Sequence, residues 1–583
     1  MRPGSDTTTA EPTSRPVAVH LNGNGHPAPA LSTPPTPRAG DGAATPSATA
    51  RIAVVVVTWN RHADVTRAIE ALSRQTYPRD LMDVVVVDNA STDGTLEHLR
   101  ERFRPDAIVQ NPTERAHEPA FEPAEPGPGP NVCGFRSLTV VRNTANLGGC
   151  GGFNTGFGFI ERNLQPDFVW LADDDADFPP DALANLVRAA QSDDRIGIVG
   201  SRTVSIADRE TTIETTIYFD RRVGAMCDEP PPHHPLHESH RQWVATTGGH
   251  RGKRDFAGIR DVDIVSACSL LARWSAVQKV GYWDWRYFIY CDDADWCLRF
   301  AKAGYRVVLN LDAVVYHTPW LLKLTPARIY YSQRNAVWML QKVLPTRELR
   351  RVTGRWMRHL LRDALRAAMH RRLFHAEIIR TTVRDIITGR AGRTGSDGPP
   401  ALPLIEAFRR AGCLRPEARV ALVCNHGDRG GAPLQWGRQV RDAIRAELAR
   451  SAQEGEAEPR WIEIVRNDVE AAALAEPAPP PEDRPPEVRI VYGGHRLSRL
   501  RRQLDLLRVP PRAVVIFDQT NDYPAVRGRW NIHIDMKKPA AAQLERDGPL
   551  PRAVFLLRWL STVVRAAVFT LTVRPYTSPT KYG

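Results

Sequence analysis

The stretch that decides the fold is Phe168-Val169-Trp170-Leu171-Ala172-Asp173-Asp174-Asp175-Ala176-Asp177, an apolar run that ends in three consecutive carboxylates. Such a run is typical of a buried strand whose end reaches an open edge of a sheet. Asp173 and Asp175 lie two residues apart, so on a strand their side chains point the same way. Adjacent carboxylates repel one another, and Mg²⁺ or Mn²⁺ offsets that repulsion. The alternative is a solvated acidic turn, because Pro179-Pro180-Asp181 follows.

Two β-branched runs, residues 52–57 and 84–87, precede this stretch and end at Thr58 and Asp88. Continuous apolar runs of this kind are typical of strands covered on both faces. A helical pattern lies between them, so we predict a parallel α/β unit. Ligands in such sheets bind beyond the carboxyl ends of the strands, which places Thr58 and Asp88 at one crevice. Both residues could equally cap the helices that follow, and the two roles are compatible.

A glycine-rich segment, Asn146-Leu147-Gly148-Gly149-Cys150-Gly151-Gly152, follows a third predicted strand at residues 138–141. Glycines let the backbone approach a ligand closely, and we expect a helix to start just after them. A glycine loop alone is weak support for a binding site. The three aspartates that follow the segment strengthen it.

A second acidic motif, Asp292-Asp293-Ala294-Asp295, follows an aromatic stretch at residues 281–290. An aromatic face such as that of Trp283 packs well against a sugar ring, and a carboxylate beside it can act as a base. Ordinary core aromatics before an acidic helix start are the alternative. His317 closes a further predicted strand, and the acidic cluster elsewhere in the sheet favours a metal-ligand role for it.

The bulk composition limits the class of protein. The chain has 583 residues, of which 42% are hydrophobic, so we expect several domains with real cores. Its net charge of +12 favours anionic partners such as phosphates, nucleic acid or acidic lipid. The 8 cysteines form no CxxC pair, which predicts reduced thiols in a cytosolic protein. We find no signal-peptide pattern and no uninterrupted apolar run of about 20 residues, so no membrane span is expected.

Taken together, these motifs resemble family 2 glycosyltransferases of the GT-A fold over roughly residues 51–340. The resemblance rests on Val57-Thr58-Trp59-Asn60-Arg61, Val87-Asp88-Asn89-Ala90-Ser91-Thr92-Asp93-Gly94, Asn146-Leu147-Gly148-Gly149, Asp173-Asp174-Asp175, Asp292-Asp293-Ala294-Asp295 and His317. Within the family the chain looks most similar to actinobacterial galactofuranosyltransferases of cell-wall galactan synthesis. Related rhamnosyltransferases usually carry Glu-Asp where this chain has Asp292-Asp293.

The resemblance implies a role for each motif. Asp293 would be the catalytic base of an inverting transfer, and Asp173, Asp175 and His317 would hold Mn²⁺ or Mg²⁺. Asp88 would face the uracil of the donor. Predicted substrate-binding residues are Thr58, Asn60, Arg61, Asp88, Asn146, Gly148, Gly149, Asp173, Asp174, Asp292 and, from the aromatic stretch, Trp283.

We predict an α/β protein in which a GT-A (Rossmann-like) nucleotide-sugar transferase domain is followed by basic helices and a second, smaller α/β unit. The expected boundaries are 1–49 for a disordered tail, 50–340 for the catalytic domain, 341–415 for basic amphipathic helices, 416–550 for the small α/β domain and 551–583 for an apolar helix and tail. Residues 347–393 contain 13 Arg, a pattern suited to an anionic bilayer, to nucleic acid, or to helices packed with a solvated face. Arg558 and Arg565 lie on one face of the apolar helix, which favours a membrane interface or a partner over a span.

The predicted function is metal-dependent, inverting transfer of galactofuranose from UDP-galactofuranose to a polyprenyl-linked cell-envelope glycan. A rhamnosyltransferase that uses dTDP-rhamnose is the alternative. A non-catalytic membrane- or carbohydrate-binding protein on a transferase fold is the alternative of another class. Nucleic-acid binding leaves the acidic motifs unexplained, so no nucleic-acid partner is expected. We expect a cytoplasmic protein that is peripheral on the inner face of the plasma membrane and binds the anionic membrane surface. A homo-oligomer is possible.

Overall fold

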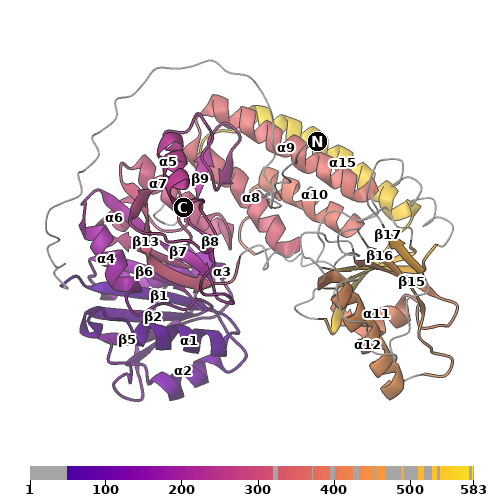
Figure 1. The fold of residues 1–583 in the computed structure, drawn as a ribbon, viewed down its shortest axis with the longest axis horizontal. Helices are drawn as coiled ribbons and strands as arrows, with labels where there is room; N and C mark the ends of the chain where they lie inside the picture. The colour runs from indigo at the N-terminus through magenta and orange to yellow at the C-terminus, as the bar shows by residue number, and fades with distance from the viewer. Residues whose placement is uncertain are drawn as a thin grey trace, which may run out of the picture. The chain divides into compact units, whose positions relative to one another are not determined.

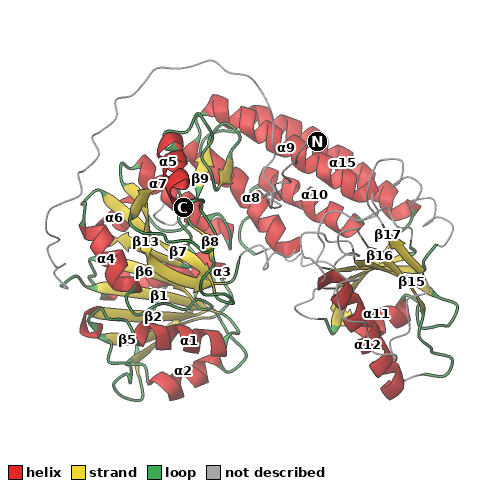
Figure 2. Cartoon of the chain, viewed as in Figure 1, coloured by secondary structure: helices red, strands yellow, loops and turns green. Residues whose placement is uncertain are grey.

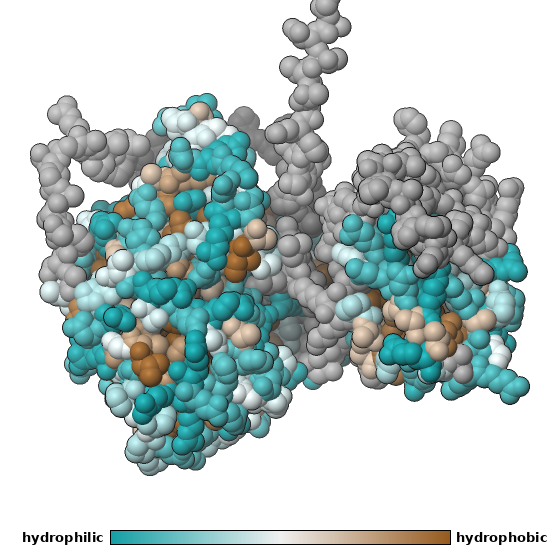
Figure 3. Space-filling view, turned by 60° about the horizontal axis from the view of Figure 1, so that its bottom comes forward, coloured by the Kyte–Doolittle hydropathy of each residue, from teal (hydrophilic) through white to brown (hydrophobic). Residues whose placement is uncertain are grey.

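The computed structural model describes residues 49–319, 326–369, 372–393, 401–424, 432–451, 453–465, 488–491, 510–517, 528–534, 539–576 and 581. The predicted disordered tail therefore lies almost wholly outside the described residues. Figure 1 shows the course of the chain, and Figure 2 shows where helices and strands alternate along it. The face seen in Figure 3 is mostly polar, with apolar side chains gathered in a few small areas.

The centre of the first sheet is formed by the strands that the sequence predicts. Strand β1 (Ile52–Thr58) pairs in parallel with both β2 (Met82–Asp88) and β6 (Phe168–Asp173), and β5 (Ser137–Asn143) pairs in parallel with β2. The apolar side chains of β1 are almost fully buried, because helices cover both faces of a parallel sheet. The carboxyl ends of β1, β2 and β6 therefore meet at one edge.

The whole sheet has 11 strands in the order β11-β13-β7-β12-β6-β1-β2-β5-β3-β4, with β8 paired to β7. The remaining strands are β3 (Ala107–Asn111), β4 (Glu125–Pro126), β7 (Ile196–Ser205), β8 (Thr212–Glu214), β11 (Ile259–Asp261), β12 (Ser269–Arg273) and β13 (Arg306–His317). Strand β12 runs antiparallel between β6 and β7, so the sheet is mixed. A separate pair is formed by β9 (Tyr218–Asp220) and β10 (Ala225–Cys227).

The helices of this unit are α1 (His62–Ser73), α2 (Thr95–Phe103), α3 (Gly148–Asn163), α4 (Ala182–Gln191), α5 (His237–Thr247), α6 (Trp274–Val280) and α7 (Asp292–Lys302), with 3₁₀ turns η1 (Arg79–Leu81) and η2 (Trp285–Tyr287). The glycine segment is the first part of α3, so the prediction of a loop with a helix after it is wrong. A Cβ on Gly152 would lie 2.3 Å from the side chain of Val57, and one on Gly156 would lie 2.5 Å from that of Val55. These glycines therefore serve close packing of α3 on β1.

The basic region contains helices α9 (Thr346–Met369) and α10 (Leu373–Thr388), which follow α8 (Pro326–Val343), and α15 (Pro549–Thr572) packs against α9 and α10 (Figure 1). One core joins Leu360, Ile379 and Phe555. The apolar faces of α9 and α10 are thus used for packing. Helix α15 is long and apolar enough to cross a bilayer, judged by length and composition alone.

A second sheet of seven strands follows the order β14-β20-β19-β18-β15-β16-β17. Its strands are β14 (Ala401–Pro403), β15 (Arg419–Cys424), β16 (Arg460–Val465), β17 (Val488–Val491), β18 (Ala513–Phe517), β19 (Trp530–Ile534) and β20 (Ala541–Arg546), with helices α11 (Leu404–Arg410) and α12 (Ala432–Ser451). Strands β15 to β18 all lie within residues 416–550, the range predicted for the small α/β domain. Strand β14 belongs to this sheet although it precedes residue 416, where the sequence places the start of the domain.

Candidate active site

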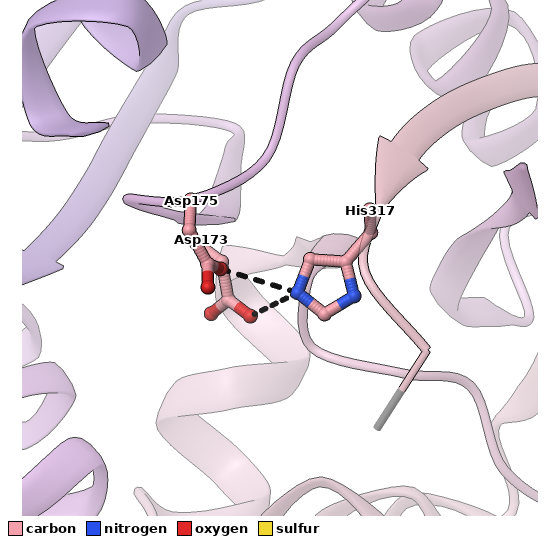
Figure 4. Close-up of side chains that lie close together, drawn as sticks. All are labelled: Asp173, Asp175 and His317. Atoms are coloured by element: carbon pink, nitrogen blue, oxygen red, sulfur yellow. Dashed lines mark hydrogen bonds and ion pairs between the residues drawn. The ribbon is translucent and has the colours of Figure 1, made fainter. Parts of the chain in front are cut away.

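The acidic triplet lies where β6 and β13 end. Figure 4 shows the carboxylates of Asp173 and Asp175 pointing toward the imidazole of His317. The Nε2 atom of His317 is 3.2 Å from Asp175 Oδ1 and 3.5 Å from Asp173 Oδ2. Two backbone hydrogen bonds between Asp177 and Tyr316 hold the turn after β6 against the end of β13. The structure therefore brings together the three residues that the sequence predicts as metal ligands.

These three residues fit a divalent cation. One ligand atom from each of Asp173, Asp175 and His317 lies within 4.8 Å of the others. Carboxylate oxygens suit Mg²⁺ and Mn²⁺, and imidazole nitrogen is a common transition-metal ligand. Arg61 is the nearby cation, with Nη1 2.7 Å from Asp175 Oδ2 and 3.7 Å from Asp174 Oδ1. The charge of Arg61 alone does not balance three carboxylates, and a divalent cation would supply further positive charge.

Asp174 differs from its two neighbours because it points toward β1. Its Oδ2 accepts a hydrogen bond of 2.8 Å from the Thr58 hydroxyl. Burial, together with the charge of Asp175, raises the pKa of Asp174 to about 7 against the opposing effect of Arg61. Asp174 and Thr58 thus fix the acidic turn to the end of β1.

The ends of β1 and β2 are tied together beside this turn. The Asn60 backbone N–H donates to Ser91 Oγ (2.9 Å), and Asn60 Oδ1 accepts from the N–H of Thr92 (2.7 Å). Asp88 is fully buried, and its Oδ1 accepts from the N–H of Ser91 (2.9 Å). Its Oδ2 has no hydrogen-bond partner among the described residues, and burial raises the pKa of this carboxyl. A buried acceptor without a donor is a place where a ligand N–H can bind.

The start of α3 lies against the segment that carries the second acidic motif. Asn146 Oδ1 accepts a hydrogen bond of 2.9 Å from the N–H of Gly148. Gly148 has φ +75°, and a Cβ there would lie 2.2 Å from the carbonyl oxygen of Phe288. A Cβ on Gly149 would lie 3.9 Å from Asp292 Oδ2. The glycines thus allow close approach between α3 and the acidic pair.

Asp292 and Asp293 begin α7 and point in different directions. Asp293 accepts hydrogen bonds from the N–H groups of Ala267 (3.3 Å) and Ala294 (2.7 Å). Asp292 Oδ2 accepts from the thiol of Cys150 (3.1 Å). Burial and the neighbouring Asp292 charge raise the pKa of Asp293 to about 8, and burial also raises the pKa of Asp292.

The two acidic motifs belong to one site because they contact the same short segment. The carbonyl of Cys268 accepts a hydrogen bond of 3.2 Å from the N–H of Asp173. The adjacent Ala267 donates to Asp293. A candidate base and a candidate metal site are therefore both connected to the segment that leads into β12.

Trp283 is not available to a substrate. Its side chain is 1% exposed, and its ring centroid lies 4.6 Å from that of Phe153 and 6.0 Å from that of Trp296. The side-chain amide of Asn154 bonds to both backbone groups of Trp283. The prediction that Trp283 stacks on a sugar is corrected by this placement, since the aromatic stretch packs into the core.

Sequence reasoning missed Glu214 as a neighbour of the site. It lies on β8 and is opposite Thr203 of β7. Burial raises the pKa of Glu214, and its charge contributes to the raised pKa of Asp293. No local motif marks this residue, because only the pairing of β8 with β7 brings it to the site.

Comparisons with known proteins agree with this arrangement. The sequence matches the family Glycosyl transferase family 2 over residues 53–117 and 133–248. It is 28% identical over 266 residues to N-acetylglucosaminyl-diphospho-decaprenol L-rhamnosyltransferase from Mycobacterium tuberculosis, with 45% of this chain and 75% of the relative covered.

The solved structures that are similar to this chain include the following two. The mannosyltransferase PcManGT from Pyrobaculum calidifontis, in complex with GDP-Man and Mn²⁺, is 20% identical with a TM-score of 0.30, covering 60% of this chain and 77% of that one. S. aureus TarS is 14% identical with a TM-score of 0.35, covering 58% and 49%.

The family match begins in β1 and ends just after α5, so it contains the acidic triplet and the glycine segment. Asp293 and His317 lie beyond the matched residues. The mixed sheet has the GT-A arrangement, with its acidic turn at the end of β6. Residues 53–117 and 133–248 therefore match glycosyl transferase family 2 in sequence, the sheet has the GT-A fold, and the chain is a glycosyltransferase.

Proposed function

We propose that this glycosyltransferase moves a sugar from a nucleoside-diphosphate donor to a glycan on a polyprenyl diphosphate, with inversion at the anomeric carbon. The observation that carries the proposal is the pair of hydrogen bonds by which residues 267 and 268 join Asp293 to Asp173. A transferase needs a base at the acceptor and charge neutralisation at the leaving diphosphate, and this site offers both. The decaprenol-linked substrate in the name of the mycobacterial relative supports the acceptor class.

Each group would have a distinct task. Asp173, Asp175 and His317 would hold Mn²⁺ or Mg²⁺, which when bound supplies positive charge for the diphosphate leaving group. The Asp88 Oδ2 atom would accept the imide N–H of a pyrimidine base. Uracil and thymine both carry that N–H, so this contact does not separate UDP from dTDP donors.

The bond changes at the sugar are those of a direct displacement. Asp293 removes the proton from the acceptor hydroxyl, and the oxygen attacks the anomeric carbon. The bond from that carbon to the diphosphate oxygen breaks on the opposite face, so the configuration inverts. A positioned base typically contributes about 10²–10⁴-fold to such a rate.

Two donor sugars fit the proposal, and each is supported by one observation. The mycobacterial relative is an L-rhamnosyltransferase, which favours dTDP-rhamnose. The Asp292-Asp293-Ala294-Asp295 motif favours UDP-galactofuranose. The mycobacterial relative gives no support for galactofuranose. Sequence similarity to a curated protein therefore supports only the rhamnosyl donor.

A panel of nucleotide sugars tests the proposal. Purified full-length protein is incubated with dTDP-rhamnose, UDP-galactofuranose, UDP-glucose and GDP-mannose, with Mn²⁺ or Mg²⁺ and a polyprenyl-diphosphate glycan. We expect sugar transfer from one of the first two donors. Transfer from GDP-mannose alone would contradict the pyrimidine assignment of Asp88, and no transfer from any donor would contradict the acceptor class.

The lipid-linked acceptor also suggests a location. We propose that the protein works at the inner face of the plasma membrane as a peripheral protein. Cell fractionation tests this, and recovery of all activity in the soluble fraction at low salt would contradict it.

A further inference from the structure

A cavity of about 320 Å³ lies between α10 and α15. Its polar lining consists of Arg380, Arg384, Arg558, Ser561, Thr562 and Arg565. The two arginines of α10 are four residues apart, and those of α15 are seven apart. These spacings correspond to one and two helical turns, so each helix presents its arginines to the cavity along one face.

The cavity carries an excess of positive charge. Glu377 pairs with Arg380 (2.7 Å) and with Arg558 (3.6 Å), and Asp385 pairs with Arg384 (2.7 Å). The fourth arginine pairs with no acidic side chain in the described part of the chain. Four guanidinium groups thus face two carboxylates. Guanidinium groups bind phosphate oxygens in a bidentate manner, so a phosphate matches this lining.

An exposed apolar stripe runs along α15 beside the cavity. One face of the helix, which includes Phe555 and Ala566, is buried against the helical core. Leu557 lines the cavity and is 70% exposed, and Leu560, Val564 and Leu571 are 54%, 65% and 72% exposed. Leu557 lies two residues after Phe555, which is about 200° around the helix and therefore on the opposite side. We call Leu557, Leu560, Val564, Val568 and Leu571 the apolar stripe.

We propose that the cavity binds the phosphate of an anionic membrane lipid while the apolar stripe enters the acyl boundary of the bilayer. Helix α15 has one face packed against the helical core, one exposed apolar face and arginines between the two. A helix of this kind can lie parallel to the membrane, in the interface between headgroups and acyl chains. Arg558 and Arg565 would be costly at the centre of a bilayer, so a spanning orientation of α15 fits less well. A soluble phosphate or a nucleic acid would use the arginines and leave the stripe in water. The inference does not depend on which sugar the catalytic domain transfers.

Vesicle flotation of the full-length protein tests the charge contribution. The vesicles are phosphatidylcholine with or without phosphatidylglycerol. Binding should require phosphatidylglycerol, and the double variant Arg558→Gln/Arg565→Gln should bind about 30-fold more weakly, because each basic residue at an anionic leaflet contributes about fivefold. The matched control is Arg102→Gln/Arg241→Gln, which removes the same charge from exposed positions on α2 and α5 and should bind like wild type.

A second variant tests the apolar contribution. Leu560→Ser/Val564→Ser changes only exposed side chains, and circular dichroism checks that the fold is kept. It should also lose vesicle binding, whereas it should not affect binding of glycerol phosphate or RNA. Equal binding by the arginine variant, its control and wild type would overturn the proposal. The proposal would also be overturned if the wild-type protein bound glycerol phosphate or RNA but did not bind phosphatidylglycerol vesicles.

Discussion

At the scale of single residues, Asp293 and Asp292 are adjacent but are held by different partners. Asp293 lies against Ala267, and Asp292 lies against Cys150. If Asp293 is the base, Asp293→Asn should reduce turnover by about 10²–10⁴-fold, because the amide has the same shape and no basicity. Nucleotide binding should survive. Asp292→Asn is the matched control and should have the milder effect on turnover, and the reverse order would exchange the two assignments.

The raised pKa of Asp293 predicts how activity depends on pH. A base acts only when it is ionised. The pH dependence of kcat/KM reports the titration of the free enzyme, so kcat/KM should rise as pH rises through about 8. Stability should change in the opposite direction. The folded state holds this proton more tightly than the unfolded chain, whose carboxyl has the ordinary value of 3.8, so metal-free stability should fall as pH rises from 3.8 toward 8.

Thermal melts of the metal-free protein across this range measure the stability effect. The decrease in melting temperature between pH 6 and pH 8 should be smaller in Asp293→Asn, which carries no charge at either pH. An identical decrease in both proteins would show that other groups cause it.

The sequence predicted the candidate site well wherever the residues of a motif lie close together in the chain or at the ends of predicted strands. Asp173 and Asp175 both reach His317, although β6 ends at Asp173 and Asp175 lies in the turn that follows it. The acids meet the end of β13 because both strands end at one edge. The hydrogen bond from Cys150 to Asp292 and the approach of Glu214 join segments far apart in the chain. No local pattern encodes such contacts.

At the scale of elements, the packing of α3 on β1 depends on glycine. A Cβ on Gly152 would lie 2.3 Å from Val57, which cannot move freely within the central strand. Gly152→Ala should therefore lower the free energy of unfolding by about 1–3 kcal/mol, even though alanine favours the helix. Gly149→Ala in the same helix is the control, because its Cβ would have no neighbour closer than 3.9 Å and stability should be unchanged or higher. Chemical denaturation measures both, and equal stabilities would contradict the packing role.

Two elements have features that no local sequence pattern marks. The apolar runs at residues 307–309 and 314–317 both belong to β13, which has an irregularity between Asn310 and Val314. The polar, histidine-rich segment at residues 233–240 leads into α5, whose His240 is buried and forms a hydrogen bond with the Tyr218 hydroxyl (3.1 Å). Polar composition alone does not reveal that a side chain has a buried partner.

At the scale of the whole molecule, the core of the catalytic unit continues into the helices that follow it. Lys342 of α8 is buried, with Nζ 2.6 Å from Asp284 Oδ2 and 3.0 Å from Asp295 Oδ2. Burial alone would raise the pKa of Asp284, but Lys342 and Arg286 lower it to about 2. The network therefore holds α7, which carries Asp293, against α8.

Removing this buried cation should destabilise the protein. Lys342→Met leaves two buried carboxylates with one cation fewer, and we expect a loss of about 3 kcal/mol in the free energy of unfolding. Lys279→Met, at an exposed position on α6, is the control and should change stability by less than about 0.5 kcal/mol. Equal unfolding midpoints for the two variants in urea would contradict a role for the network in stability.

The central claim is that Asp173, Asp175 and His317 act with Asp293 as one metal-dependent sugar-transfer site. The most direct measurement is release of nucleoside diphosphate from the accepted donor by full-length protein with Mn²⁺, with chelator, and with Asp175→Asn. We predict turnover with the metal and a loss of at least about 10²-fold in chelator and in the variant. Full turnover in chelator, or in Asp175→Asn, would contradict the claim.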